Sequence, residues 1–175
     1  MTLNDFYPSW RNTLSKPGPV MTQTRYLILA CGNTLRGDDG VGLWLAEWAE
    51  RRFRDQPAVR IIADHQWTPE LAEDVAHAQS ALFIDCTLDS PPGSVNLTPV
   101  EPASDAQVRA THHLGAAELL ALARELYNSL PRNAQMLTIG AASTGLTEEF
   151  SPAVAAALPE ACRLIEETLQ RLLSE

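Results

Sequence analysis

The sequence lacks the features that mark several large classes of protein. No uncharged apolar run approaches the roughly 20 residues that a membrane-spanning helix needs, so no transmembrane segment is predicted. The chain does not start with a positively charged segment followed by an apolar core, and no secretory signal is expected. Lys and Arg total 13 against 22 Asp and Glu, giving a formal net charge of -9. This balance argues against nucleic acid as a partner, because phosphate binding needs a basic surface.

Cysteine is also scarce. Cys31, Cys86 and Cys162 lie far apart without a CxxC spacing, and the first two lie in or beside apolar, strand-like runs. An odd number of such cysteines indicates reduced thiols packed in a core. Together with the missing secretory signal, this predicts a cytoplasmic protein.

Common catalytic motifs are missing as well. There is no GxGxxG or GxxxxGK[ST] loop for a nucleotide, no HExxH for a zinc protease and no GxSxG nucleophile elbow. Ser143-Thr144-Gly145 has no recognisable partner base, and Cys31 is expected to pack rather than to attack a substrate.

What the chain does contain is an alternation of strand-like and helix-like segments. Residues 1–24 are polar, proline-interrupted and aperiodic, which predicts an N-terminal tail, disordered or acting as a strap, before a single domain over residues 25–175. Alternating segments predict an α/β sandwich around a five-stranded, mostly parallel twisted sheet. The predicted strands are Tyr26–Cys31, Val59–Ala63, Ala81–Asp85, Ser94–Leu97 and Met136–Ala142, and the predicted helices run over about 39–54, 68–78, 111–127 and from 151 onward.

The segment from Gly32 to Gly42 is the most informative part of the chain. It joins the first strand to the first helix through a glycine-rich turn that carries Asp38 and Asp39. Glycines allow backbone conformations that a Cβ would penalise, and they permit close approach of another group. Carboxylates at a helix N-terminus meet unpaired amides, so they stay ionised. The turn therefore offers a hard metal ligand or a proton acceptor.

Three polar positions are predicted to meet at one edge of the sheet. Asp39 follows the first strand, Asp85 ends the third, and His112 begins the helix after the exposed fourth strand. In an open α/β sheet, ligands bind beyond the carboxyl ends of the strands. Two carboxylates and an imidazole suit a divalent transition metal.

Each position also has a simpler interpretation. Asp38 or Asp39 can cap the first helix, and Asp85 can close a turn. His112 and His113 follow Thr111, a good N-cap, so either can be a surface residue of the first turn, and at most one of them should face a shared site.

Several ordered motifs resemble those of the nickel–iron hydrogenase maturation endopeptidases. The opening Gly32-Asn33-x-Leu35-x-x-Asp38-Asp39-Gly40-x-Gly42 is similar to that family's first motif. The resemblance continues through Phe83-Ile84-Asp85-Cys86, Pro92-Gly93-Ser94, Ala110-Thr111-His112-His113-Leu114-Gly115 and Phe150-Ser151-Pro152, and it covers residues 25–170.

The resemblance implies a three-layer α/β/α fold and a cytoplasmic protease that removes a C-terminal extension from a nickel-loaded hydrogenase large-subunit precursor. On this chain, the implied catalytic and metal-contacting residues are Asp39, Asp85 and His112. Nickel would be supplied by the precursor, with no resident catalytic metal. A monomer that binds neither nucleic acid nor a membrane is expected.

The chain departs from the family where Asp64 to Leu71 replaces a glycine-rich turn, which makes His65 a fourth polar group beside the predicted site. Two other functions stay open. One is an escort that binds the large subunit or its metal without cutting. The other is a small-molecule enzyme that binds an anion at the glycine turn, although Asp38 and Asp39 would repel the anion.

Overall fold

A computed structural model describes residues 25–104 and 114–173. Its sheet has five strands in the order β2-β1-β3-β5-β4, of which only β4 is antiparallel to its neighbour. The prediction of a mostly parallel, five-stranded α/β sheet is therefore confirmed. The strands are β1 (Tyr26–Cys31), β2 (Val59–Asp64), β3 (Ser80–Thr87), β4 (Val95–Pro99) and β5 (Asn133–Gly140).

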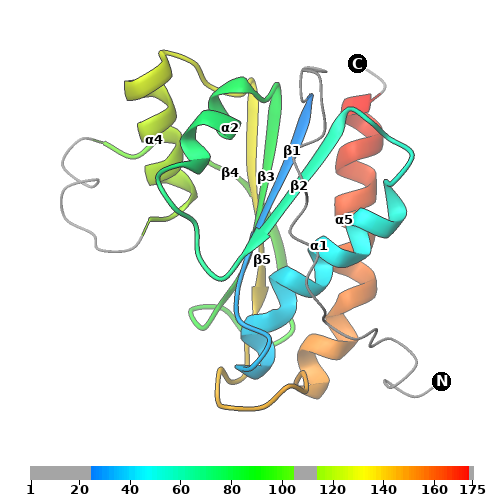
Figure 1. Cartoon of the computed structure of the whole chain (residues 1–175). Helices are drawn as coiled ribbons and strands as arrows, with labels where there is room; N and C mark the ends of the chain where they lie inside the picture. The colour runs from blue at the N-terminus through cyan, green and yellow to red at the C-terminus, as the bar shows by residue number, and fades with distance from the viewer. Residues whose placement is uncertain (1–24, 105–113, 174–175) are drawn as a thin grey trace.

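Helices cover both faces of the sheet. The described helices are α1 (Val41–Arg52), α2 (Leu71–His77), α4 (Ala116–Tyr127) and α5 (Pro152–Leu173). Figure 1 shows α1 and α5 on one side of the sheet and α2 and α4 on the other, the arrangement of a three-layer α/β/α sandwich. None of the described helices is long and apolar enough to cross a bilayer.

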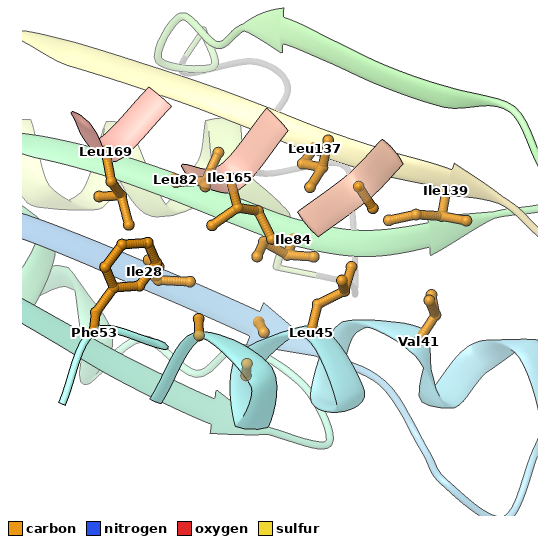
Figure 2. Close-up of a cluster of buried hydrophobic side chains, with 14 of the residues drawn as sticks. Ile28, Val41, Leu45, Phe53, Leu82, Ile84, Leu137, Ile139, Ile165 and Leu169 are labelled. Carbon is orange, nitrogen blue, oxygen red and sulfur yellow. The ribbon is translucent and has the colours of Figure 1, made fainter. Parts of the chain in front are cut away.

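Alternation along the strands gives each face of the sheet its own hydrophobic core. Successive strand side chains point to opposite faces, so Ile28 joins the cluster under α1 and α5 while Leu27 and Leu29 join the cluster under α2 and α4. Figure 2 shows the first cluster, in which Ile28 and Ile84 of the sheet lie between side chains of α1 and α5. All six residues of β1 are buried, as expected for a central strand covered on both faces.

Three predicted helices begin later in the structure than in the sequence analysis. A 3-10 turn, η2 (Gly37–Gly40), occupies the predicted start of α1. Thr68 does not cap α2: its carbonyl accepts the Leu71 N–H in a turn, and the helix starts only at Leu71. The start of α4 was predicted at Thr111, outside the described residues, and α4 itself begins at Ala116. Capping residues were therefore poor guides to the starts of α1 and α2, whereas α5 begins at Pro152 as predicted, and its Val154 N–H donates to the Ser151 hydroxyl at 3.3 Å.

Candidate metal-recognition site

The carboxyl ends of β1 and β3 form the centre of the candidate site. β1 pairs in parallel with β2 on one side and with β3 on the other. The chain leaves β1 toward β2 and leaves β3 toward β4 and β5, so these two connections run in opposite directions across the sheet. Such a switch in strand order is where open α/β sheets bind ligands. Asp39 lies in the 3-10 turn after β1, and Asp85 lies near the end of β3. The fold thus brings together two of the predicted site residues.

Asp39, Asp85 and Cys86 form a group that could hold a metal ion. One ligand atom from each side chain lies within 4.8 Å of the other two, and all three residues are half-buried. The Cys86 thiol donates a hydrogen bond to Asp39 Oδ1 at 3.3 Å. Two carboxylates and a sulfur combine hard and soft ligands, which favours borderline divalent metals such as nickel or zinc over magnesium.

The Asp85 carboxylate is hydrogen-bonded to the next residue of its own strand. Its Oδ1 accepts the backbone N–H of Cys86 at 2.7 Å. Burial raises the pKa of Asp85 and the charge of Asp39 adds to this effect, while hydrogen bonds from the Cys31 thiol and the Cys86 amide partly offset it. The site therefore holds two carboxylates whose mutual repulsion a cation would relieve.

Both thiols near the carboxylates are held in the protonated form. Burial, the charge of Asp85 and the hydrogen bond to Asp39 raise the pKa of Cys86 to about 12. Burial, followed by the charge of Asp85, raises the pKa of Cys31 still further. A protonated thiol is a poor nucleophile, which agrees with the expectation that Cys31 is a packing residue.

Asp38 fixes the turn that carries Asp39. It is 1% exposed, and its carboxylate accepts the backbone N–H groups of Ala142, Ser143 and Ser151 at 2.8, 3.2 and 2.7 Å. Burial alone would raise the pKa of Asp38, but these hydrogen bonds lower it below its ordinary value. An ionised side chain in the 3-10 turn after β1 thus holds the loop between β5 and α5 against the glycine turn.

Two glycines allow the backbone to pack closely at this edge. Gly32 has a φ of +146°, and a Cβ there would lie 1.9 Å from the Asp39 carbonyl oxygen. A Cβ on Gly42 would lie 2.2 Å from the Cys31 carbonyl oxygen and 3.2 Å from that of Ile84. The start of α1 therefore rests directly on the ends of β1 and β3. This contact sets the position of Asp39 relative to Asp85.

Of the remaining residues considered for the site, the structure describes His65 but not His112. His112 lies outside the described residues, as do Thr111 and His113. His65 follows β2, and its Nδ1 lies 3.2 Å from the Gly32 carbonyl oxygen, so the ring borders the glycine turn. Within the described residues, His65 is not part of the potential metal-binding group.

The simpler interpretations of the two aspartate positions are wrong. The helix N-cap is Gly40, and no side chain caps α1, because Asp38 binds the distant loop instead. Asp85 does not close a turn either, since it lies within β3.

In the sequence analysis, Cys86 was interpreted only as a reduced thiol packed in the core and was not included in the site. Cys86 directly follows the predicted site residue Asp85. Successive side chains along a strand point to opposite faces, however, so adjacent residues are not expected to share a site. The two side chains nevertheless come within reach of one cation, and the Asp85 carboxylate accepts the Cys86 N–H. No pattern in the sequence predicts such a side-chain conformation.

Searches of protein-family models and of curated protein sequences give no match. Solved structures, in contrast, match over most of the chain. The hydrogenase maturating endopeptidase HybD from E. coli is 19% identical, with a TM-score of 0.68, over 84% of this chain and 93% of its own.

Two further matches have higher sequence identity. A hydrogenase 2 maturation peptidase from a Thaumarchaeota archaeon is 26% identical, with a TM-score of 0.59, over 83% of this chain and 98% of its own. The [NiFe] hydrogenase maturation protease HycI from Thermococcus kodakarensis is 25% identical, with a TM-score of 0.59, over 88% and 95% of the two chains. The resemblance indicated by the motifs is thus confirmed across most of the chain, which has the fold of the hydrogenase maturation proteases.

Proposed function

We propose that this protein is an endopeptidase that removes the C-terminal extension of a nickel-loaded hydrogenase large-subunit precursor. The observation that carries the proposal is the convergence of Asp39 and Asp85 in one potential metal-binding group at the β1–β3 edge. The fold shared with hydrogenase maturation proteases supports the reaction class.

In this proposal Asp39, Asp85 and His112 contact the nickel that the precursor brings. Nickel is then part of the substrate, and it identifies a precursor whose metal centre is complete. It can also act as a Lewis acid that polarises the scissile carbonyl. A carboxylate that is not coordinated can orient or deprotonate the attacking water. No nucleophile from the protein is needed, in keeping with the protonated thiols of Cys31 and Cys86.

Exposed apolar side chains beside the site support a protein as the substrate. Leu35 and Leu146 are 56% and 92% exposed, and the Thr147 N–H donates to the Leu35 carbonyl at 3.1 Å. Their loops, after β1 and before α5, lie side by side in Figure 1. Apolar groups gathered on an open surface favour contact with a macromolecule. We expect the protein to act as a cytoplasmic monomer on this partner, without nucleic acid or a membrane.

A non-cleaving escort for the large subunit is the second candidate. It stays open because the raised pKa values of the two thiols near Asp85 leave no obvious protein nucleophile among the described residues, so that cleavage would depend on water alone. An escort would bind the nickel-loaded precursor through the same carboxylates but would release no peptide.

The test is to mix the purified protein with nickel-loaded precursor and to record intact masses over time. Nickel-free precursor and the Asp39→Ala protein serve as controls. Loss of one C-terminal peptide only with nickel and only with Asp39 is the expected result. A stable complex without any change in mass would instead support the escort, and neither complex nor cleavage would reject both functions.

A further inference from the structure

We propose that Cys86 is a further metal-contacting residue, whose sulfur makes the site selective for a borderline, thiophilic divalent cation such as nickel. The inference deepens the proposed function and rests on it for the identity of the cation. It concerns a thiol to which the motif resemblance gives no role.

Distance is the first argument. A zinc-like divalent cation lies about 2.3 Å from a thiolate sulfur and about 2.1 Å from a carboxylate oxygen. For angles between about 90° and 109° at the metal, the two ligand atoms must then lie about 3.1 to 3.6 Å apart. Cys86 Sγ and Asp39 Oδ1 are 3.3 Å apart. One cation can therefore contact both atoms without a rearrangement of the backbone.

Orientation is the second argument. The Asp85 carboxylate is held by the Cys86 amide through Oδ1, and ligand atoms of Asp39, Asp85 and Cys86 all lie within 4.8 Å of one another. The three side chains come from two elements that the Gly42 contact holds in a fixed relation. A set of ligands ordered in this way needs little reorganisation on binding.

Comparison with a second nearby thiol shows that Cys86 is a candidate ligand because of its position and not only because it is a cysteine. Cys31 is buried and its thiol is hydrogen-bonded to Asp85, yet Cys31 does not belong to the potential metal-binding group among the described residues. Cys162 lies on α5, partly buried against the core that α1 and α5 cover. The chain thus contains two internal controls for the role of one sulfur.

Coordination changes the thiol in a defined way. The S–H bond breaks, a metal–sulfur bond forms, and one proton leaves to water, with no change in oxidation state. The hydrogen bond from Cys86 to Asp39 is replaced by two bonds to the shared cation. Hard cations such as magnesium gain little from sulfur, so the thiol should discriminate between metals.

The test uses the purified full chain with Co²⁺, Ni²⁺ or Mg²⁺ alone. Saturating Co²⁺ should produce a sulfur-to-cobalt charge-transfer band in the near ultraviolet. The band should persist in Cys31→Ser and Cys162→Ser but disappear in Cys86→Ser. The Cys86→Ala change should weaken Ni²⁺ binding at least about tenfold, as loss of a supporting metal contact does elsewhere, and should leave Mg²⁺ binding unchanged.

Circular dichroism of each variant verifies that the fold is retained. Absence of the band in the wild-type protein, or its persistence in Cys86→Ser, would overturn the inference. Its failure is separable from failure of the proposed function. Nickel-dependent cleavage without a sulfur band rejects the role of Cys86 alone, whereas a Cys86-dependent band without any cleavage rejects the protease alone.

Discussion

The carboxylate of Asp38 accepts the backbone N–H of Ser151 at 2.7 Å across 113 residues of sequence. This hydrogen bond, with those from Ala142 and Ser143, joins the turn after β1 to the loop that leads into α5. Asp39 is the next residue, so its position depends on a neighbour that is not itself in the potential metal-binding group. One aspartate of the pair is structural, and the other is available to a ligand.

Replacing Asp38 by Ala should lower the free energy of unfolding by about 2–4 kcal/mol, because three backbone N–H groups lose a charged acceptor. Urea unfolding followed by circular dichroism measures the change. The exposed Asp55 provides a matched control, and Asp55→Ala should change stability by no more than about 0.5 kcal/mol. Equal effects of the two changes would show that the Asp38 hydrogen bonds contribute nothing special.

The stabilisation by Asp38 should depend on pH. Its pKa is lowered in the folded protein, so its contribution is fully present above the ordinary aspartate pKa of the unfolded chain and is lost as the pH falls through the lower folded value. The difference in stability between the wild-type protein and Asp38→Asn should therefore be constant near neutral pH and shrink in acid. Unfolding curves between neutral pH and strongly acidic pH test this, and a difference that grows in acid would contradict it.

Gly42→Ala should cost about 3 kcal/mol or more, because the added Cβ would lie 2.2 Å from the Cys31 carbonyl oxygen in a closely packed region. Processing should fall as well, since relieving the clash moves Asp39 away from Asp85. Gly145→Ala is the control, because its Cβ would meet only the Ser143 hydroxyl at 3.4 Å. Thermal unfolding of both variants decides the matter, and similar melting temperatures would refute the packing argument.

Asp39→Asn and Asp85→Asn should each reduce nickel-dependent processing by about 100-fold or more, as expected when a metal contact is lost. Asp85→Asn should at the same time raise the melting temperature at neutral pH. The pKa of Asp85 is raised in the folded protein, so ionisation of this carboxyl destabilises the fold increasingly as the pH rises through the folded pKa. An amide avoids that cost.

Processing rates and melting temperatures of the two variants should be measured on the same preparations. A destabilised Asp85→Asn protein at neutral pH would show that the carboxylate serves the fold rather than a ligand.

The double change of Leu35→Ser and Leu146→Ser should raise KM for the precursor by about tenfold with little effect on kcat. Both side chains are exposed beside the site, and their loss removes apolar contact area that is made equally in the ground and transition states. Leu126 on α4 is 61% exposed and lies at the opposite end of the sheet, so Leu126→Ser is the control. Steady-state processing kinetics should separate the two, and an unchanged KM in the double variant would exclude this surface from precursor binding.

Much of the fold could be predicted from local sequence. The apolar run of β1 and the alternating pattern that places Ile28 and Leu27 in different cores are periodic signals, and periodicity survives folding because it matches the geometry of the strand. The starts of α1 and α2 were predicted poorly. Before α1, Asp38 accepts the N–H of Ser151 from a distant loop instead of capping the helix. Before α2, the Thr68 carbonyl accepts the Leu71 N–H in a turn, and the helix starts only after that turn.

The candidate site was likewise predicted only in part from the sequence. From the sequence alone, Asp39 could be placed just after one buried strand and Asp85 near the end of another, and parallel strands end at the same edge of a sheet. The three-dimensional arrangement was needed to see that Asp38 holds a loop while Asp39 remains available, and that Cys86 lies beside both carboxylates. These roles depend on backbone amides more than 100 residues away and on the hydrogen bond between the Asp85 carboxylate and the Cys86 amide, and neither produces a periodic pattern in the sequence.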